Sequence, residues 1–598
     1  MEPREIFQKR INEFKEVAEA LKIQSNRFSI IRIVCFLLSI VLLVYFANAG
    51  NLGALLAVVL IFPFLFGTIV KYHNRLIYRR NHHVFLQTIN QSESVRQEGN
   101  LKPFDQGEEF LDIQHPYVAD LDVFGKNSLF QLLNRTTTGS GRALLADWLK
   151  THSGKTEIEK RQEAVKELSK NIDWRQDLQA RGMHFQDEES HIHTLLEWIE
   201  EPDRLTAKTM YWFLQIIMPV ITIALIILYF SYGISGYIPF AAIVVNSLIL
   251  KKVFEIATET TEKTSASIKA LKAYNSLIGK IENTTFESEK LQLLQANFSH
   301  DDFLASHEIK KLQVILDNLE TRANILYWFF NAVFLLDLYW LLRAEHWKRK
   351  TKVDVSHWFD AISEFEVLNS LAGFSFANRD FCFPIMRDES YSLSAKHIGH
   401  PLIKSKQRIS NNFSMKGKGK VIVITGSNMS GKSTFLRTIG VNTVLAQIGA
   451  PVCAEEMEVG VIQVFTSMRT QDDLEESVSS FYAELKRLRQ LLDLLEKDEP
   501  VLFMLDEILK GTNSKDRHNG AISLIKQLST LNASGFVSTH DLELGNLAKE
   551  SDFVENYSFN SQIIGDEIIF DYKLHDGICK SFNASKLMER IGIKMNSN

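Results

Sequence analysis

The stretch Val421-Ile-Val-Ile-Thr-Gly-Ser-Asn-Met-Ser-Gly-Lys-Ser-Thr434 dictates the local structure of the C-terminal part of this chain. Four apolar, β-prone residues lead toward Gly426, four residues separate Gly426 from Gly431, and a helix-compatible sequence follows Thr434. This spacing predicts a strand, a phosphate-binding loop and a helix, and therefore an α/β domain of the P-loop type. The glycines let backbone N–H groups point at an anionic phosphate on the helix N-terminus.

The same loop supplies candidate residues for a nucleotide and its metal ion. We expect Lys432 to reach the β- and γ-phosphates of ATP, and the Ser433 hydroxyl to complete the coordination shell of Mg²⁺. The predicted nucleotide-binding residues of the loop are Gly426, Ser427, Asn428, Met429, Ser430, Gly431, Lys432, Ser433 and Thr434. The alternative is a chance Gly/Ser-rich turn, and the complete spacing between a strand and a helix argues against it.

A second apolar strand, 500–505, ends in two carboxylates, Asp506 and Glu507. Such a strand delivers side chains to the carboxyl edge of a parallel sheet, where ligands bind in open α/β folds. Asp506 is predicted to hold Mg²⁺ through its water shell, and Glu507 to orient or deprotonate the attacking water. Alone, the pair would be interpreted as a solvated strand end. Together with the phosphate loop it indicates a hydrolytic site.

Two further elements complete the predicted site. Ser538-Thr539-His540 follows another apolar strand, which predicts that His540 lies near the γ-phosphate as a polar sensor. Ser479 and Ser480 open a helix with a leucine-rich apolar face, so hydroxyl groups are presented at a helix N-terminus. A second phosphate-facing helix start usually serves a nucleotide bound by a facing subunit. We therefore expect a homodimer that holds ATP between its α/β domains.

Two pairs of long apolar segments lie far from these motifs. The first pair is 28–47, broken only by Arg32, and 52–70; the second is 210–230 and 234–250. Each segment approaches the ~20 apolar residues that span a bilayer, so each pair predicts a membrane hairpin. A signal peptide is the competing interpretation of the first pair, but no small-residue cleavage pattern follows the apolar run. A buried helical hairpin is the alternative for the second.

Charges predict the orientation of the first hairpin. Basic residues flank it on both sides, whereas its tip, 48–53, carries no charge. The positive-inside rule places both flanks in the cytosol, so we expect a multi-pass membrane protein with four transmembrane helices and cytoplasmic soluble domains. A third apolar run, 325–342, contains Asn331 and Asp337. Because a charge in mid-membrane is costly, we interpret this run as a packed helix of the soluble body, and its contact with the membrane surface stays open.

Composition limits the remaining possibilities. The 598 residues are too many for one core, and the net charge of -5 gives no general basic field for nucleic acid, although a local patch is compatible with it. The four cysteines lack metal-ligand spacing, so we expect neither a disulfide framework nor a zinc site. The expected segments are a charged N-terminal helix (1–27), a first membrane hairpin (28–70), a helical core (71–209), a second hairpin (210–250), a helical core and lever (251–394) and an ATPase domain (395–598).

Several motifs, taken in order, resemble the ATPase domain of the MutS family of mismatch-repair proteins. They are Thr425–Thr434, Asp472–Leu474 with Ser479–Leu485, Leu505–Asp516, Ser538–His540 and Tyr572–Gly577. His400–Ile403 and Leu133–Leu145 are similar to the helical core of that family, which extends the resemblance to residues 105–595. The resemblance implies an ABC-like dimeric ATPase with composite sites. It also implies that Ser479 touches the partner's nucleotide and that Phe413 stacks on the adenine.

Other parts of the chain depart from the family pattern. The family reads mismatches with an N-terminal α/β domain that carries a Phe-x-Glu wedge, and here a charged helix and a hairpin stand in its place. Phe14-Lys15-Glu16 fits that string, but so does Phe553-Val-Glu555. The second hairpin interrupts the helical core, no counterpart of the family's DNA clamp is recognisable, and Lys510 and Lys515 replace small or Arg residues. The resemblance therefore supports ATP hydrolysis more strongly than mismatch recognition.

The sequence as a whole predicts a membrane-anchored, MutS-like ATPase that acts as a dimer. Two functions of different class remain open. One is a tethered enzyme that couples ATP hydrolysis to binding of mismatched, branched or distorted DNA. The other is an ATP-driven membrane machine, or a membrane-associated scaffold, that does not act on DNA. Few ionisable residues lie within the membrane runs, which argues against a transport pathway.

Overall fold

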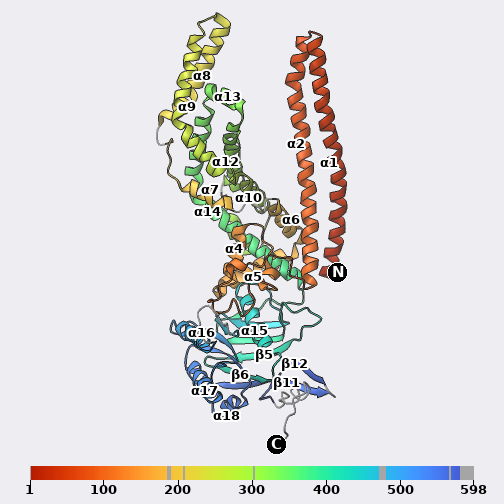
Figure 1. The fold of residues 1–598 in the computed structure, drawn as a ribbon, viewed down its shortest axis with the longest axis vertical. Coiled ribbons are helices and arrows are strands. Elements are labelled where there is room, and N and C mark those ends of the chain that lie inside the picture. Colours follow the sequence, from red (N-terminus) through yellow and green to blue (C-terminus); the bar gives the residue numbers. More distant parts are fainter. Residues whose placement is uncertain are drawn as a thin grey trace.

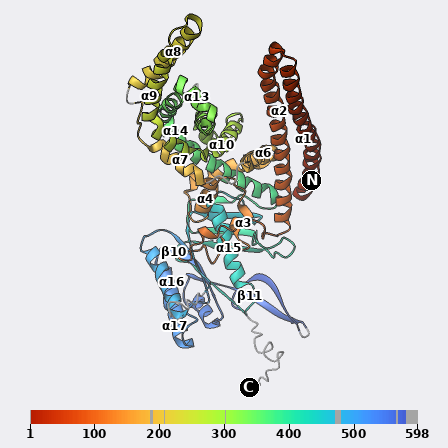
Figure 2. The same ribbon diagram turned by 45° about the horizontal axis from the view of Figure 1, so that its top comes forward.

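The computed structural model consists of two helical arms, a helical body and an α/β domain (Figure 1). It describes residues 2–184, 190–206, 209–300, 303–469, 480–564 and 567–579. Both arms rise from the body on the side opposite the α/β domain, and they stand apart from each other in both views (Figures 1 and 2). The two apolar regions of the sequence thus point the same way, away from the predicted nucleotide site.

The first arm is an antiparallel pair of helices, α1 (Pro3–Asn48) and α2 (Leu52–Gln97). Each has 46 residues, which corresponds to roughly 70 Å at the rise of an α-helix. The Asn51 side chain begins α2 by accepting a hydrogen bond from the Ala54 N–H at 3.1 Å. The charged leader 1–27 and the following apolar run, predicted as separate segments, form one continuous helix because no Gly or Pro interrupts them after Pro3.

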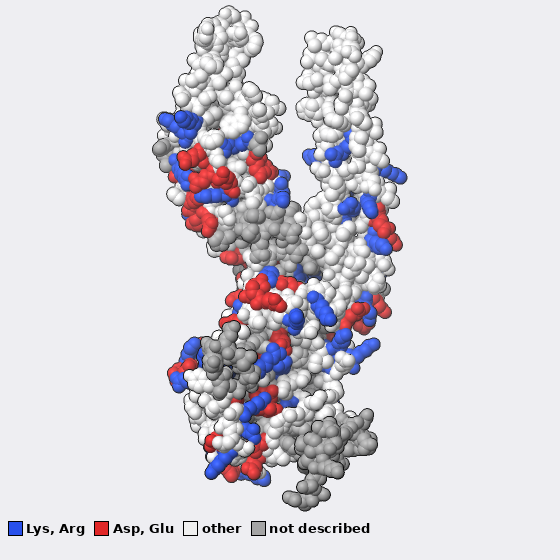
Figure 3. Space-filling view, viewed as in Figure 1, with Lys and Arg blue, Asp and Glu red and all other residues white. Residues whose placement is uncertain are grey.

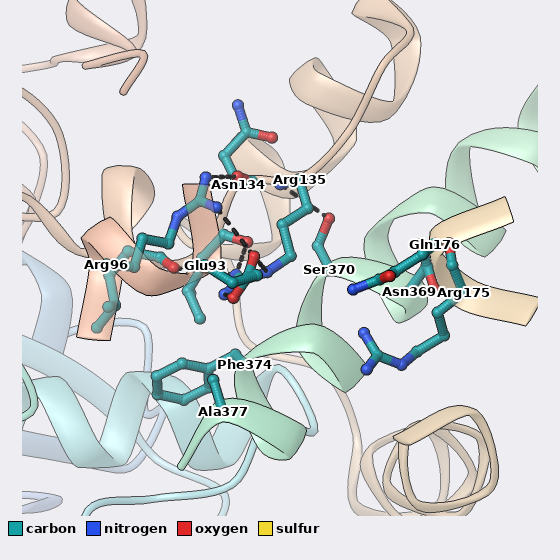
Figure 4. A network of polar contacts seen from close by, with 12 residues as sticks. Glu93, Arg96, Asn134, Arg135, Arg175, Gln176, Asn369, Ser370, Phe374 and Ala377 are labelled. Carbon is teal, nitrogen blue, oxygen red and sulfur yellow. Dashed lines mark hydrogen bonds and ion pairs between the residues drawn. The ribbon is translucent and has the colours of Figure 1, made fainter. Parts of the chain in front are cut away.

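The lower end of α2 is fixed to the body by a buried ionic network (Figure 4). Arg135 donates two hydrogen bonds to the Glu93 carboxylate, from Nε to Oε1 at 2.7 Å and from Nη2 to Oε2 at 2.8 Å. Arg96 donates a third, from Nη1 to Oε1 at 3.0 Å. Burial opposes ionisation of Glu93, yet the two arginines hold its pKa below the ordinary value. The Arg135 N–H also donates to Ser370 Oγ on α14, so the network joins the first arm to the long helix of the body.

The body is built from amphipathic helices whose apolar faces share one hydrophobic core with the α/β domain. Its helices are α3 (Leu129–Leu133), α4 (Gly139–Trp148), α5 (Lys155–Lys170), α6 (Ile172–Met183), α7 (Ser190–Glu200), α10 (Ser267–Glu282), α11 (Glu289–Ala296), α12 (Ala305–Glu320) and α14 (Leu336–Ala377), with 3₁₀ turns η1 (Glu108–Phe110) and η2 (Thr321–Ala323) and a short ladder of β1 (Ser299–His300) and β2 (Phe303–Leu304). The 42-residue α14 runs from the second arm down toward the α/β domain (Figure 1).

The second arm contains α8 (Thr209–Tyr232), α9 (Tyr237–Thr264) and α13 (Ile325–Phe334). Asn246 of α9 links all three, because its side-chain N–H₂ donates to Thr222 Oγ1 of α8 at 3.0 Å and to the Ala332 carbonyl of α13 at 2.9 Å. The predicted hairpin 210–250 is therefore present as a helical pair, but a third helix packs against it.

The run 325–342 is two helices rather than the single packed helix that the sequence predicted. α13 and α14 meet at an angle of 79°, and Leu335 between them adopts a left-handed conformation with φ 52°. The Asn331 side chain accepts a hydrogen bond from the Asp337 N–H at 2.9 Å and thereby caps α14. The Asp337 carboxylate is buried against the Tyr327 hydroxyl at 2.8 Å and Arg322 at 3.2 Å. Asp337 thus pairs inside the protein, while α13 exposes most of its apolar side chains.

Three described helices, α1, α2 and α8, are long and apolar enough to cross a membrane, and the bent pair α13–α14 would add a fourth if it counts as one span. The criterion rests on length and composition only, and α9, predicted from 234–250, is not among the three. The upper ends of both arms are free of charged side chains on the visible face (Figure 3). In the sequence, 33–70 and 209–250 contain no Lys, Arg, Asp or Glu.

The α/β domain contains a six-stranded sheet with the order β12-β11-β6-β10-β9-β8 and a four-stranded sheet with the order β3-β7-β4-β5 among its described residues. The central strands pair in parallel, and β12 pairs antiparallel to β11. The strands are β3 (Ile385–Arg387), β4 (Ser392–Ile398), β5 (Asn411–Lys416), β6 (Val421–Gly426), β7 (Glu456–Gly460), β8 (Gln463–Ser467), β9 (Val501–Asp506), β10 (Ala533–Thr539), β11 (Val554–Ile564) and β12 (Glu567–Asp576). The helices are α15 (Lys432–Gln447), α16 (Ser480–Leu495), α17 (Ser514–Thr530), α18 (Leu547–Glu550) and the 3₁₀ turn η3 (Leu542–Asn546).

Candidate active site

The loop after β6 has the predicted strand, loop and helix geometry. Val421 to Ile424 are fully buried between β10 and β11, and α15 begins at Lys432. Gly426 and Gly431 have φ of 157° and 109°. A Cβ on Gly426 would lie 2.7 Å from the Phe559 carbonyl oxygen, so a larger residue would collide with the neighbouring strand. The glycines of the motif therefore serve backbone geometry, as the sequence indicated.

The loop holds donors that match an anionic ligand. The Lys432 ammonium donates to the Gly426 and Ser427 carbonyls at 3.0 and 3.1 Å, inside the curl of the loop. Within the described residues, the buried hydroxyls of Ser427 and Ser430 have no hydrogen-bond partner, and no side chain caps the N-terminus of α15. Buried polar groups rarely stay unsatisfied, so these hydroxyls and the helix N-terminus fit a phosphate.

The predicted carboxylates lie at the carboxyl edge of the parallel sheet. Asp506 ends β9 and pairs in register with Ser538 of β10, and Thr539 of β10 pairs with Thr425 of β6 just before the loop. The Ser538 hydroxyl donates to Asp506 Oδ1. Burial lowers the pKa of Lys432, and the nearby carboxylates Glu507 and Asp506 oppose this shift. The parallel register thus brings the loop lysine and both carboxylates into one electrostatic environment.

Glu507 is clamped between two cationic or polar groups. Its Oε1 lies 2.7 Å from His540 Nε2 and its Oε2 lies 3.1 Å from the Lys510 ammonium. The hydrogen bond from His540 is the main reason why the pKa of Glu507 falls to about 2, with Lys510 contributing and partial burial opposing. A carboxylate with so low a pKa is a weak base. The contacts with His540 and Lys510 fix the position of the Glu507 carboxylate, as an orienting role requires.

Glu484 of α16 is a site residue for which the sequence patterns predicted no role. Its carboxylate accepts hydrogen bonds from the Leu509 N–H and, at 3.1 Å, from the Lys510 N–H. These bonds hold the turn after Glu507, in which Glu507 and Leu509 have positive φ values of 54° and 60°. Burial raises the pKa of Glu484. The family motif contains this residue, but only the fold reveals that it faces a turn some twenty-five residues later in the chain.

Tyr572 is a second residue without a predicted role. Its ring packs against Gly431, with Cδ1 3.2 Å from where a Cβ of that glycine would be, and its side chain is substantially exposed. The Asn411 side chain donates to the Tyr572 carbonyl at 3.1 Å. An exposed aromatic ring therefore borders the phosphate loop, and it comes from β12 at the end of the domain.

The assignment of Phe413 to adenine stacking is wrong for this structure. Phe413 is 5% exposed and packs against Phe435, Phe536 and Tyr557, with ring centroids 5.8, 5.1 and 5.7 Å away. Alternation along β5 turns Phe413 and Met415 inward and their neighbours outward, so the ring belongs to the core.

The remaining predicted site residues fall into two groups. Asn428 and Met429 are exposed on the loop. On the first turn of α15, Thr434 is exposed and Ser433 is half-buried. Ser479 and the Asp472–Leu474 motif lie outside the described residues, while the helix predicted after them is present as α16. The structure thus brings the loop, Asp506, Glu507 and His540 together, and it leaves the contact assigned to Ser479 as a prediction.

Comparison with protein-family models identifies the two parts of the molecule. MutS domain III matches residues 111–372, and MutS domain V matches residues 422–592. The chain belongs to the MutS family. The MutS domain V match contains the loop, Asp506, Glu507, Glu484 and His540. The MutS domain III match covers most of the helical body and includes the second arm, whereas the first arm lies outside both matches.

Individual MutS relatives agree with this assignment. The chain is 31% identical over 220 residues to "DNA mismatch repair protein MutS" of Thermotoga sp. (strain RQ2), which covers 36% of this chain and 27% of the relative. It is 31% identical over 234 residues to "MutS protein homolog 4" of Mus musculus, an alignment that covers 38% of this chain and 24% of the relative. It is 30% identical over 237 residues to "DNA mismatch repair protein MutS" of Natronomonas pharaonis, which covers 39% of this chain and 27% of the relative. The matched segment spans about a quarter of the length of these relatives.

Proposed function

We propose that this chain is a membrane-anchored, MutS-type ATPase that binds and hydrolyses ATP with Mg²⁺. The observation that carries the proposal is the convergence, at one sheet edge, of the Lys432 loop with its unsatisfied hydroxyls and the Asp506–Glu507–His540 group. Phosphate donors and carboxylates at the same edge are the two requirements of nucleotide hydrolysis by P-loop enzymes.

Each residue has a defined part in this proposal. The loop from Gly426 to Thr434 binds the phosphates, with Lys432 leaving the loop carbonyls to contact them. Ser433 and Asp506 are the residues that would hold Mg²⁺, which neutralises phosphate charge when bound. Glu507 orients the attacking water, and His540 holds the other face of that carboxylate in place.

The dimer proposal is supported by the position of α16. Its first residues pack against the turn after Glu507, since a Cβ on Gly511 would lie 2.5 Å from the Phe481 Cβ. Glu484 of the same helix bonds that turn directly. If Ser479 touches the nucleotide of a facing subunit, α16 links that nucleotide to the Glu507 turn of its own subunit, so each site would sense the other.

Membrane anchoring is supported by the arrangement of the two arms. Their charge-free ends, 33–70 and 209–250, are far apart in sequence yet point in one direction, away from the α/β domain (Figures 1 and 3). Both ends could therefore insert into the same bilayer, with the body and the α/β domain on its cytosolic side.

We propose two candidates for the load of the ATPase, that is, for what ATP hydrolysis acts on. The relatives named DNA mismatch repair protein support DNA, in mismatched, branched or distorted form, as the ligand of the body. A membrane machine is the second candidate, and α14 favours it, because this one helix extends from the second arm to the α/β domain. On the loop side, Arg437 of α15 pairs with Asp122 of the body at 3.0 Å and would transmit motion.

One experiment separates the two candidates. Steady-state ATPase activity of the detergent-purified full chain is measured alone and with homoduplex, mismatched and four-way-junction DNA, with Lys432→Ala as the blank. Stimulation by one DNA form supports the DNA load and names its class. Robust activity that is indifferent to every DNA supports the membrane machine, and activity no higher than that of Lys432→Ala contradicts the ATPase itself.

A further inference from the structure

A groove lies between α12 and the first third of α14, on the body just below α13. Its volume is about 670 Å³. Its lining includes four cationic and two aromatic side chains, which are Lys310, Lys311, Arg343, Lys350, Tyr339 and Trp340. The groove is remote from the candidate active site, which belongs to the α/β domain beyond the lower end of α14 (Figure 1).

The groove has an excess of positive charge. Among the described residues that line it, Glu308 is the only carboxylate, and this side chain is buried and bonded to Lys311 at 2.9 Å and Lys350 at 2.7 Å. Lys310 and Arg343 have no carboxylate partner anywhere in the described part of the chain, and the Arg343 guanidinium lies over the Tyr339 ring at 4.6 Å. Two uncompensated cations beside an aromatic wall favour an anionic ligand that also has an apolar part.

The groove lies at the level where the charge-free part of the second arm begins. Trp212, in the first turn of α8, packs edge-on against His346 of the groove with ring centroids 6.3 Å apart. Tyr339 and Trp340 are in the first two turns of α14, directly after the bend that follows α13. Trp and Tyr rings gather at the same depth as the head groups of a bilayer.

Apolar surface continues upward from the groove. On α13, Ile325 is 76% exposed and Phe329 is 70% exposed, with Leu326 and Phe330 beside them. A soluble body would bury such a face, so its exposure next to α8 and α9 indicates contact with lipid chains. The cationic lining of the groove is therefore continuous with the exposed apolar face of α13, which extends into the proposed bilayer.

We propose that this groove binds the phosphate head group of an anionic phospholipid whose acyl chains lie along α13. Lys310 and Arg343 contact the phosphate, and Tyr339 and Trp340 flank the region between head group and chains. Basic pockets beside membrane helices on the cytosolic side select anionic lipids in this way. The inference rests on the proposed membrane insertion of the second arm. It assigns a lipid ligand to a part of the helical body that has no role in nucleotide chemistry.

The test uses the full chain and two lipid probes. Native mass spectrometry of the detergent-purified protein compares retention of phosphatidylglycerol with retention of phosphatidylcholine. We expect wild type to retain phosphatidylglycerol about thirtyfold better, which corresponds to about 1 kcal/mol for each of the two basic residues that contact the phosphate. The double variant Lys310→Gln/Arg343→Gln should lose this preference. The matched control Arg349→Gln/Lys352→Gln removes the same charges from exposed positions on α14 outside the groove and should keep it.

The outcomes that would overturn the inference are distinct. Equal retention of both lipids by wild type would refute the lipid site. An equal loss of the phosphatidylglycerol preference in the two double variants would also refute it. Displacement of the lipid by inorganic phosphate would assign the groove to a free anion, and displacement by a DNA duplex would assign it to nucleic acid. ATPase activity of both variants reports folding. Flotation of wild type with phosphatidylcholine vesicles tests insertion separately: failure to float refutes membrane anchoring and the lipid site together, whereas flotation without lipid preference refutes only the site.

Discussion

The two arms have similar charge-free ends but are attached to the body in different ways. The first arm is fixed near its base by a buried ion pair, Glu93 with Arg135, and lies outside both MutS matches. The second arm emerges from within the MutS domain III match. Its base is held by Glu345 of α14, whose carboxylate accepts the N–H groups of 204–206 at 2.7 to 3.1 Å.

The two modes of attachment predict how ATP-driven motion would be distributed between the arms. The second arm is continuous with α14 through α13 and is bonded to it again through Glu345, so a movement of α14 must move that arm. The first arm meets α14 through Ser370 and the Glu93 network near the lower end of the helix, where a rotation gives little displacement. We therefore expect the tips of the two arms to move relative to each other during the ATPase cycle.

The largest expected effect comes from Glu507→Gln. We expect ATP turnover to fall about 10³-fold, about 4 kcal/mol of barrier, because the amide cannot orient water as the carboxylate does. ATP should still bind, which would hold the arms in the ATP-bound arrangement. Spin labels at Asn51 and Ser235, at the two tips, measure the distance, and Glu543→Gln at an exposed carboxylate is the control. A tip distance that is the same with and without ATP in wild type would remove the proposed difference between the arms.

Arg135→Met should loosen the base of the first arm and leave the second in place. The variant leaves Glu93 as a buried charge with fewer partners, and breaking such a pair costs about 3 kcal/mol. Chemical unfolding of the solubilised protein measures the loss, and hydrogen exchange of α1 and α2 localises it. The double variant Glu93→Leu/Arg135→Met removes both charges and should recover part of the stability. Faster exchange in α8 and α9 instead would contradict separate attachment.

Glu345→Gln should loosen the base of the second arm by a smaller amount, about 2 kcal/mol, because the amide keeps one acceptor oxygen but loses the charge that strengthens the hydrogen bonds. Exchange at 204–206 and in α8 should rise, with α1 and α2 unchanged. Glu320→Gln, an exposed change at the end of α12, is the matched control. Equal exchange in Glu345→Gln and wild type would show that α14 does not hold the second arm through this residue.

The smallest expected effect is an acid-sensitive first arm. The pKa of Glu93 is held below its ordinary value of 4.5, so the network contributes stability that is present above this value and is lost as the pH falls through the lower folded pKa. Hydrogen exchange of α2 near residue 93 should therefore rise below pH 4.5. In Glu93→Gln the exchange near this position should not respond to pH in the same window. The same acid response in both proteins would exclude Glu93 as its cause.

Local sequence patterns predicted the parts of the molecule in which neighbours in the chain are also neighbours in space. The phosphate loop is the clearest case, because Gly426 and Gly431 are needed by the backbone of their own turn. The apolar runs of the first arm were also predictable, since a helix is specified by its own residues. The bend within the run 325–342 was not predictable, because it depends on the contacts of Asp337 with Tyr327 and Arg322 in the folded protein.

The residue pattern is sufficient to predict the strand, loop and helix around Lys432, the carboxylate pair at the end of β9, the charge-free segments and the membership of the MutS family. The folded molecule was needed to show that Phe413 is a core residue, that Glu484 holds the turn after Glu507, and that Lys310 and Arg343 face one groove. These two sets of features differ in how far apart the contacting residues lie along the chain. A spacing rule describes contacts within a few residues, whereas these side chains acquire their surroundings from helices and strands that only folding brings beside them.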